Sequence, residues 1–406
     1  MKVLLVASKA GYQTEAFAAA AKGLGIELDL ATNRCHHLDD PWRDGALAVD
    51  FDRPVLEPQD WDGIVAVGDQ ASVVAAQLAE QFGLAFHPVD AVQACRSKFE
   101  MRERFRRAGM LTPEYVRLPT VGQALASAEL QFFIGFPCVL KPIGLSASRG
   151  VIRANNRAEF DAALARIRRL LAQTPDLARD PQSAFIQIEK FIPGREFAVE
   201  GLVHQGRLEV LATFDKPDPL DGPFFEETIY VTPSRESAAV QDEILSATQR
   251  AVTALGLWQG PIHAECRVNA EGVWMLEVAG RPIGGLCARV LGSLEEVILS
   301  HALGRAPVRE GPLPDGRGSV GAAVMMIPIP RAGVYQGVAG LDQARTLADV
   351  EITAVPGQQL VPLPEGASYL GFIFSRAAAS PAEAEQQVRL AHGKLAFEIQ
   401  TALRVV

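Results

Sequence analysis

The sequence has few cysteines, and they lie far apart along the chain. Only five of the 406 residues are cysteine, and no two of these form a Cys-x-x-Cys motif. Isolated cysteines argue against a disulfide framework and against a zinc site, and they fit a reducing compartment. The five are Cys35, Cys95, Cys138, Cys266 and Cys287.

Long apolar runs and an excess of basic residues are missing as well. The apolar run that begins at Val3 ends before Ser8, which is too short for the core of a signal peptide or for a membrane span. The 39 Lys and Arg residues are outnumbered by 48 Asp and Glu residues, so the net charge of −9 gives no electrostatic footprint for nucleic acid. We therefore expect a cytoplasmic protein that binds neither a membrane nor nucleic acid.

Several common catalytic signatures are absent too. The first apolar run is not followed by Gly-x-Gly-x-x-Gly, and the chain lacks the P-loop motif Gly-x-x-x-x-Gly-Lys-Ser/Thr. It also lacks the Gly-x-Ser-x-Gly elbow of many hydrolases and the His-Glu-x-x-His motif of zinc peptidases. These absences disfavour a dinucleotide enzyme, a P-loop enzyme, a serine hydrolase and a zincin.

The chain reads as three domains of mixed α/β and α+β character. Short apolar runs alternate with Ala-rich helical segments in residues 1–94, which predicts a small open parallel sheet. We expect a second domain over residues 95–305, with a lid at about residues 113–187, and an α+β domain over residues 306–406. The Gly- and Pro-rich segment 311–319 is the clearest linker.

The sequence also predicts the local structure of five segments. Residues 89–109 read as one helical stretch whose basic residues form a solvated face. Helices are also expected over residues 157–171, 236–255 and 381–396. Residues 333–340 read as rich in turns. The basic residues of the first stretch are Lys98, Arg102, Arg104, Arg106 and Arg107.

Residues 260–281 read as a hairpin with two acidic strands. If residues 270–272 form a three-residue loop, Gly272 takes its left-handed position and Glu265 lies directly opposite Glu277. Like charges so placed repel, and a divalent cation between them would create an oxygen site suited to magnesium. With a two-residue loop the two side chains would lie on opposite faces, and one would face solvent. His263 would share the face of Glu265, in a structural or a substrate-facing role.

Two further segments could hold a nucleotide. Residues 135–142 form an apolar strand that delivers Lys141, and the following small residues could cradle phosphate oxygens with backbone N–H groups. Backbone groups at residues 190–192 could bind an adenine edge, and Glu196 could accept hydrogen bonds from ribose hydroxyls. Either segment taken alone also fits a plain hairpin with an exposed loop.

Taken in order, these segments resemble the ATP-grasp superfamily of carboxylate–amine ligases over about residues 95–303. The resemblance is closer to the L-amino-acid ligase group, which joins amino acids into dipeptides. Residues 213–217, 225–234 and 260–265 carry it, and the tail from residue 333 to residue 372 extends it over nearly the whole chain. It implies an N-terminal parallel α/β domain, a central ATP-grasp domain with a mobile lid, and a C-terminal α+β domain.

The resemblance also implies roles for individual residues. ATP phosphates would contact Lys98, Lys141, Ser146, Ser148 and Gly150. The adenosine would contact Glu189, Lys190, Phe191, Ile192 and Glu196. Mg²⁺, or Mn²⁺ in its place, would bind Glu265 and Glu277. Catalytic roles would fall to Arg281, His263 and Lys141. Many relatives have Asn where this chain has Ala279, which leaves the number of metal ions open.

The implied reaction has two steps. A substrate carboxylate attacks the γ-phosphate of ATP and gives an acyl phosphate and ADP; an amine then displaces phosphate and gives an amide or peptide bond. The expected partners are small-molecule carboxylates and amines, chiefly amino acids, and a second copy of the chain in a homodimer. Two alternatives remain: a ligase for a non-amino-acid carboxylate, and a non-catalytic ATP-binding module.

Overall fold

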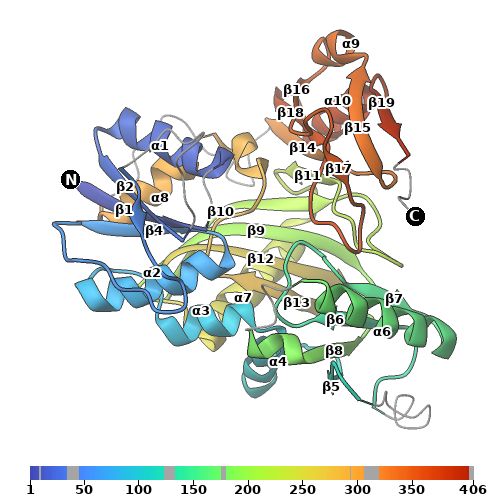
Figure 1. Cartoon of the computed structure of the whole chain (residues 1–406), viewed down its shortest axis with the longest axis horizontal. Coiled ribbons are helices and arrows are strands. Elements are labelled where there is room, and N and C mark those ends of the chain that lie inside the picture. Colours follow the sequence, from blue (N-terminus) through green and yellow to red (C-terminus); the bar gives the residue numbers. More distant parts are fainter. Residues whose placement is uncertain are drawn as a thin grey trace.

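The structure is a computed structural model of the chain, and it describes residues 1–8, 11–33, 45–122, 133–174, 180–292, 294–305 and 320–401. Cys35 and the predicted linker lie outside these residues. The four described cysteines are free and buried. The described strands form four sheets, and the expected mixed fold, with a parallel sheet at the N-terminus, is confirmed (Figure 1). Among the described residues, no helix is both long and apolar enough to span a membrane.

The N-terminal sheet has four parallel strands in the order β3-β2-β1-β4. Its central strand β1 is a continuous apolar run, buried on both faces as parallel strands are. The strands are β1 (Lys2–Ala7), β2 (Glu27–Thr32), β3 (Leu47–Ala48) and β4 (Gly63–Val67), and the helices that follow β1 and β4 are α1 (Tyr12–Leu24) and α2 (Asp69–Phe82).

The stretch expected to be helical, residues 89–109, consists of two helices. Helix α3 (Val89–Arg96) ends at Ser97, whose extended backbone breaks the helix. The Ser97 side chain then accepts the N–H of Glu100 and caps α4 (Lys98–Arg107). The break turns the first turn of α4, and with it Lys98, towards the lid.

An antiparallel sheet of eight strands forms the centre of the molecule, in the order β13-β12-β9-β10-β11-β14-β18-β16. Helix α7 (Ala238–Leu255) begins two residues later than expected and packs on it. The sheet runs through the predicted domain boundary at residue 305, because β11 pairs with β14. Its strands are β9 (Arg195–His204), β10 (Arg207–Lys216), β11 (Ile229–Thr232), β12 (Gln259–Asn269), β13 (Gly272–Ala279), β14 (Gly321–Ile327), β16 (Asp349–Ile352) and β18 (Gly371–Ala378).

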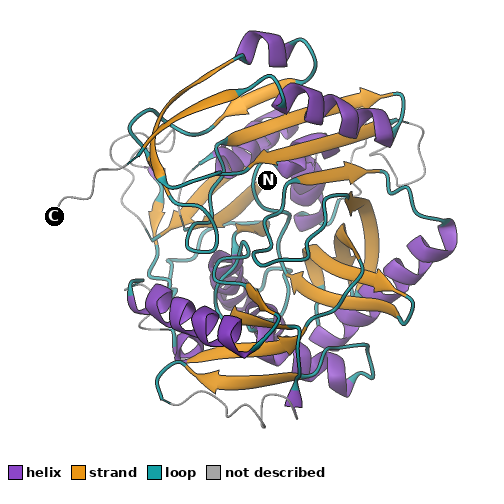
Figure 2. Ribbon diagram, turned by 90° about the vertical axis from the view of Figure 1, so that its right-hand side faces the viewer, coloured by secondary structure: helices purple, strands orange, loops and turns teal. Residues whose placement is uncertain are grey.

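A separate four-stranded sheet with one helix occupies the region that was predicted to be the lid, and we keep that name for it (Figure 2). Its order is β5-β8-β6-β7, and apolar side chains of α6 (Arg157–Ala172) pack with those of the strands in one core. The lid sheet ends at Lys190, slightly beyond the expected limit. Its strands are β5 (Tyr115–Pro119), β6 (Cys138–Pro142), β7 (Ile152–Ala154) and β8 (Phe185–Lys190), with the short 3-10 helix η3 (Pro181–Ala184) before β8.

The C-terminal region differs from the prediction in two places. Residues 333–340 are not a turn-rich segment, because they contain strand β15 (Gly333–Ala339). The last helix, α10 (Pro381–His392), ends early and is followed by β19 (Ala396–Gln400), which pairs with β15. The remaining elements are η4 (Cys287–Leu291), α8 (Leu294–Ala302), α9 (Leu341–Arg345) and β17 (Gln359–Leu360).

The acidic hairpin of β12 and β13 has a two-residue loop, which is the alternative that was expected to place Glu265 and Glu277 on opposite faces. Asn269 pairs with Gly272, which leaves only residues 270 and 271 in the loop. A β-bulge at Leu276 inserts one extra residue before Glu277 and thereby places Glu265 opposite Glu277 after all. The expected carboxylate pair therefore exists, but the bulge creates it and the turn does not.

Candidate active site

A cavity lies between the lid and the acidic hairpin, and its empty space, with the open solvent at its mouth included, is about 790 Å³. Most of the predicted site residues line it. Gly150, His263 and Arg281 do not, although Gly150 lies between two residues that do. The lining residues expected from the sequence are Lys98, Lys141, Ser146, Ser148, Glu189, Lys190, Phe191, Ile192, Glu196, Glu265 and Glu277.

Three cations gather at the lid side of the cavity around one buried carboxylate. Glu189 accepts hydrogen bonds from Arg102 Nε at 2.8 Å and from Lys141 Nζ at 2.5 Å. Burial opposes ionisation of Glu189, but these two cations outweigh it and lower its pKa to about 2. Burial, together with the charges of Arg102 and Lys98, lowers the pKa of Lys141. The excess of positive charge favours a bound anion.

The small-residue loop, residues 143–151, closes over these cations. Ala147 and Ser148 both have a φ of 54°, and Gly150 has a φ of 73°. Such left-handed conformations are free of steric cost for Gly but not for Ala or Ser, which carry a Cβ, and they turn the backbone sharply above the lysines. Lys98 Nζ donates to the Leu145 carbonyl and ties α4 to the loop. The arrangement could hold phosphate oxygens between lysine side chains and backbone N–H groups.

The segment after β8 offers one backbone donor to a purine base. The N–H groups of Lys190 and Phe191 are already bonded to the carbonyls of Glu114 and Pro137. The Ile192 N–H has no partner among the residues that the structure describes, and Ile192 lines the cavity. This observation supports the predicted adenine contact and narrows it to one donor. The side chain of Glu189 is engaged by cations, so only its backbone could reach a base.

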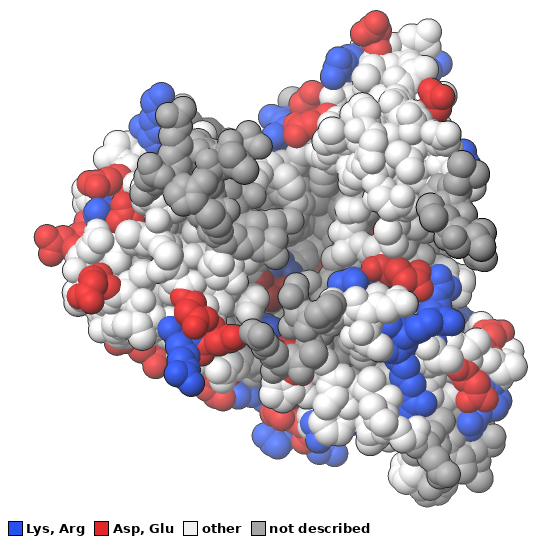
Figure 3. Space-filling model, viewed as in Figure 1, with Lys and Arg blue, Asp and Glu red and all other residues white. Residues whose placement is uncertain are grey.

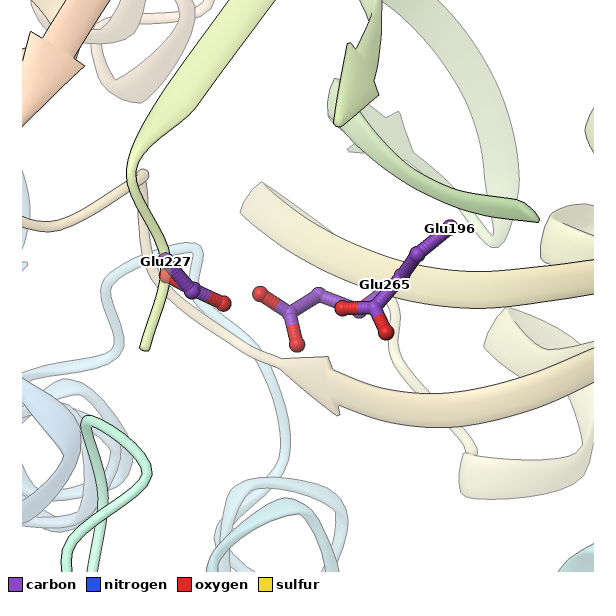
Figure 4. A group of neighbouring side chains, drawn as sticks. All are labelled: Glu196, Glu227 and Glu265. Atoms are coloured by element: carbon purple, nitrogen blue, oxygen red, sulfur yellow. The ribbon is translucent and has the colours of Figure 1, made fainter. Parts of the chain in front are cut away.

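Three carboxylates from β9, β12 and the segment before β11 converge at the opposite side of the cavity, as Figure 4 shows for Glu196, Glu227 and Glu265. Their oxygens lie close enough to one another to hold a metal ion. The ammonium of Lys216, however, contacts all three, at distances of 3.0, 2.7 and 2.8 Å. A buried lysine therefore already supplies the cation at the centre of this cluster.

The proton distribution in this cluster is uneven. Burial and the neighbouring charge of Glu265 raise the pKa of Glu227 to about 7. Burial also opposes ionisation of Glu265, but Lys216 and His263 reverse that effect and hold its pKa well below the usual range. Glu265 is therefore the permanently charged member. Glu196 is fully engaged, because Lys216 reaches its Oε1 and Arg267 donates to its Oε2 at 2.8 Å.

Glu277 has the properties expected of a metal ligand. It is half-buried, lines the cavity and lies opposite Glu265 in the hairpin. Within the described part of the chain its carboxylate has no hydrogen-bond or ion-pair partner. An unpaired carboxylate beside a second, charged one fits a hard divalent cation such as Mg²⁺. The residues present thus fit the predicted metal, with Glu277 and Glu265 as the ligands.

His263 and Arg281 are each fixed by an acidic partner. His263 contacts Glu200 through Nδ1 and Glu265 through Nε2, the latter at 3.3 Å. Burial disfavours a charged imidazole, but these two carboxylates outweigh it and raise the pKa of His263 to about 9. Arg281 Nε donates to Asp69 at 2.6 Å, across the boundary to the N-terminal domain. Both side chains are therefore positively charged and held in place.

Sequence reasoning missed several residues of the site. Arg102 was assigned to a solvated face, but its side chain is only 1% exposed and pairs with Glu189. Its spacing of four residues from Lys98 places both on one helix face, a signal that was available. Arg267 and Leu276 also line the cavity and were not predicted, whereas Lys216 and Glu227 lie in segments that carried the resemblance but had no role assigned. The bulge turns Leu276 and Glu277 together towards the cavity, which alternation along a strand does not predict.

Two family descriptions match separate parts of this chain. Residues 134–290 match the ATP-grasp domain, and residues 325–400 match L-amino acid ligase C-terminal domain 2. The chain thus combines an ATP-grasp domain with the C-terminal domain of L-amino acid ligases. Over 99% of both chains it superposes on the crystal structure of an L-amino acid ligase from Bacillus licheniformis, with a TM-score of 0.80 and 24% identity.

Curated relatives include a ligase and a synthase. The alanine–anticapsin ligase of Bacillus subtilis is 28% identical over 224 residues, which is 52% of this chain and 46% of the relative. Dapdiamide A synthase of Enterobacter agglomerans is 26% identical over 261 residues, which is 62% of this chain and 56% of the relative. The chain therefore spans about half the length of the curated relatives that it matches.

Proposed function

We propose that this protein is an ATP-dependent ligase that joins the carboxylate of one amino acid to the amine of another through an acyl phosphate. One observation carries the proposal: Lys98 and Lys141 line one side of the cavity, and Glu277, which has no partner in the described part of the chain, lines the other side opposite Glu265. The cations suit the phosphates of ATP, and the carboxylates suit the divalent ion that accompanies them. A ligase and a synthase among the relatives support the same chemistry.

The chain's own residues would perform the reaction mainly by position and charge. Lys98 and Lys141 would hold the phosphates, and the Ile192 N–H would hold the base. When bound at Glu265 and Glu277, Mg²⁺ or Mn²⁺ would neutralise charge on the phosphate oxygens. Arg281, already charged and oriented by Asp69, would stabilise the phosphoryl group in transfer.

Each step balances. An oxygen of the substrate carboxylate forms a bond to the γ-phosphorus as the bond to the β,γ-bridging oxygen breaks, and ADP leaves. The neutral amine of the second substrate then forms a bond to the acyl carbon, phosphate leaves with the bonding electrons, and the amine loses a proton. Closure of the lid would exclude the water that otherwise hydrolyses the acyl phosphate. Because ATP and the free cysteines both suit the cytoplasm, we propose that location as well.

The test is Mg²⁺-dependent release of ADP in the presence of pooled L-amino acids. In Glu277→Ala we expect the release to fall by about a hundredfold to a thousandfold, because a charged ligand facing the phosphates is lost. Glu271→Ala, in the exposed loop of the same hairpin, is the matched control and should keep full activity. Full turnover in Glu277→Ala would contradict the metal assignment. If the protein binds ATP but releases no ADP with any substrate tested, a non-catalytic ATP-binding module is favoured. If it releases ADP only with carboxylic acids that are not amino acids, a ligase for a non-amino-acid carboxylate is favoured.

A further inference from the structure

The C-terminal domain touches the lid through one short segment, residues 361–366, which we call the C-terminal loop. It lies between β17 and β18 and contacts the lid at the end of the small-residue loop (Figure 1). The Gly150 N–H donates to the Pro364 carbonyl at 2.8 Å, and Arg149 Nε donates to the Glu365 carbonyl at 2.8 Å. The Glu365 carboxylate accepts two hydrogen bonds from Arg166 of α6, at 2.5 and 2.8 Å.

The contact falls on the part of the lid that would cover the phosphates. Arg149 and Gly150 directly follow Ser148, which lines the cavity. Gly150 is held from its other side by the lid itself, since a Cβ at this position would lie 2.6 Å from Cγ of Pro142. Its backbone is therefore fixed between Pro142 of the lid and Pro364 of the C-terminal loop.

Arg166 connects this contact to a third part of the molecule. Its guanidinium lies 5.0 Å from the ring centre of Phe224, in the segment before β11. Phe224 forms a β-bridge with Ile152 of the lid, and its neighbour Phe225 lines the cavity. Figure 3 shows acidic and basic side chains next to one another where the lid meets the C-terminal domain. One arginine thus joins the lid, the C-terminal loop and a wall of the cavity.

We propose that Glu365 is a positioning residue for the ATP phosphates. Through Arg166 and the backbone contacts at Arg149 and Gly150, it holds the small-residue loop in the closed position. The C-terminal domain thereby determines how long the loop excludes water from the reaction. This inference rests on the proposed function for its link to the reaction, while the loop's position can be tested without any acceptor substrate.

The first test measures the loop directly in the full-length protein. Because the Gly150 N–H is bonded to Pro364, hydrogen exchange of a peptide covering residues 143–151 reports on the contact. In Glu365→Ala we expect exchange there to become about fivefold faster, the effect of losing one well-aligned ion pair at a partly exposed site. Glu351→Ala is the matched control. It removes an ion pair with Arg289 that has nearly the same exposure but joins the C-terminal domain to η4.

The second test measures catalysis. We expect Glu365→Ala to raise the KM for ATP by about fivefold, to leave kcat for ADP formation nearly unchanged, and to lower the amount of amide formed per ADP. General destabilisation would lower total activity without changing that ratio. The double variant with Arg166→Glu and Glu365→Arg restores an ion pair and should recover the wild-type ratio.

The outcomes separate the two proposals. Unchanged exchange in Glu365→Ala, or equal changes in Glu351→Ala, would overturn the positioning role. Failure of the charge swap to restore the KM and the amide-to-ADP ratio would overturn it too. Faster exchange in a protein that forms no ADP with any acceptor would leave the positioning role in place and contradict the proposed function.

Discussion

At the scale of single residues, His87 joins the N-terminal domain to the acidic hairpin. Its Nδ1 accepts the N–H of Trp258 at 3.1 Å, so its Nε2 carries the proton that is donated to the Pro261 carbonyl at 3.1 Å. Both ring nitrogens are therefore satisfied in the neutral form. Burial lowers the pKa of His87 to about 4. Gly260 and Gly280 leave room for the ring, because a Cβ on either would come within 3.4 Å of it.

We predict that His87 makes stability depend on pH. Its pKa is lower in the folded state than the value of 6.5 in an unfolded chain, so its contribution is fully present above 6.5 and is lost as the pH falls towards 4. Between about pH 7 and about pH 5, the stability advantage of the wild type over His87→Gln should shrink by about 2 kcal/mol. Urea unfolding of both proteins at both pH values measures this. An equal difference at the two pH values would contradict the prediction.

Many of the residues that line the cavity could be predicted from the sequence, but their contacts could not. The sequence predicted the lysines and carboxylates of the site, because their motifs occur in a fixed order. It did not predict that Arg102 is buried or that Lys216 lies among three carboxylates. Both depend on contacts with segments far along the chain, and a basic residue on a helix is ordinarily exposed.

At the scale of elements, the turn of the lid at Gly150 determines where the phosphates could bind. Gly150→Ala would place a side chain against Pro142 in a backbone conformation that suits glycine. We predict that this substitution raises the KM for ATP by about tenfold, because the loop must shift away from its closed position. Steady-state kinetics with varied ATP measures the effect.

Gly83→Ala is the control for this prediction. Gly83 has a φ of +68°, close to that of Gly150, but a Cβ there would meet no atom within 4 Å. It ends helix α2, so it shares the backbone strain without contacting the lid. A similar rise in the KM of Gly83→Ala would show that general strain, and not the position of the loop, is the cause.

Most elements could be predicted, and those that were missed share a physical reason. Apolar runs and Ala-rich segments identify β1, α1 and α2 because burial and helix propensity act locally. The segment that forms β15 is rich in glycine, so it resembles a turn, and only pairing with β17 and β19 makes it a strand. The bulge at Leu276 likewise depends on the partner strand, since its own sequence carries no signal.

At the scale of the whole molecule, the central and C-terminal domains share one sheet and its cores. Ile229 and Val231 of β11 pack in the same core as Ala323 and Met325 of β14. The other face of β14 packs with side chains of the central domain. The predicted linker suggested a separable domain, because composition reports local flexibility and not strand pairing. The two parts therefore depend on each other for burial.

We predict that a chain ending at residue 305 does not fold as a stable monomer. It would expose the buried edge of β11 and the apolar faces that β14 and β18 cover. Size-exclusion chromatography and thermal unfolding should show aggregation and no cooperative transition. Co-expression of residues 306–406 should restore soluble protein by rebuilding the sheet. A monodisperse, cooperatively unfolding fragment would contradict this account.

The lysine enclosed by three carboxylates affects how the cavity would bind a divalent cation. Lys216 is a counter-ion that belongs to the chain itself. Glu196, Glu227 and Glu265 therefore have a cation beside them whatever ions the solution contains. In many acidic metal sites the carboxylates repel one another until the metal ion binds. Here Lys216 already neutralises part of the acidic wall, and Glu277 has no partner in the described part of the chain. On the proposed function, the shape of this cluster would not depend on the supply of divalent ions, whereas catalysis would.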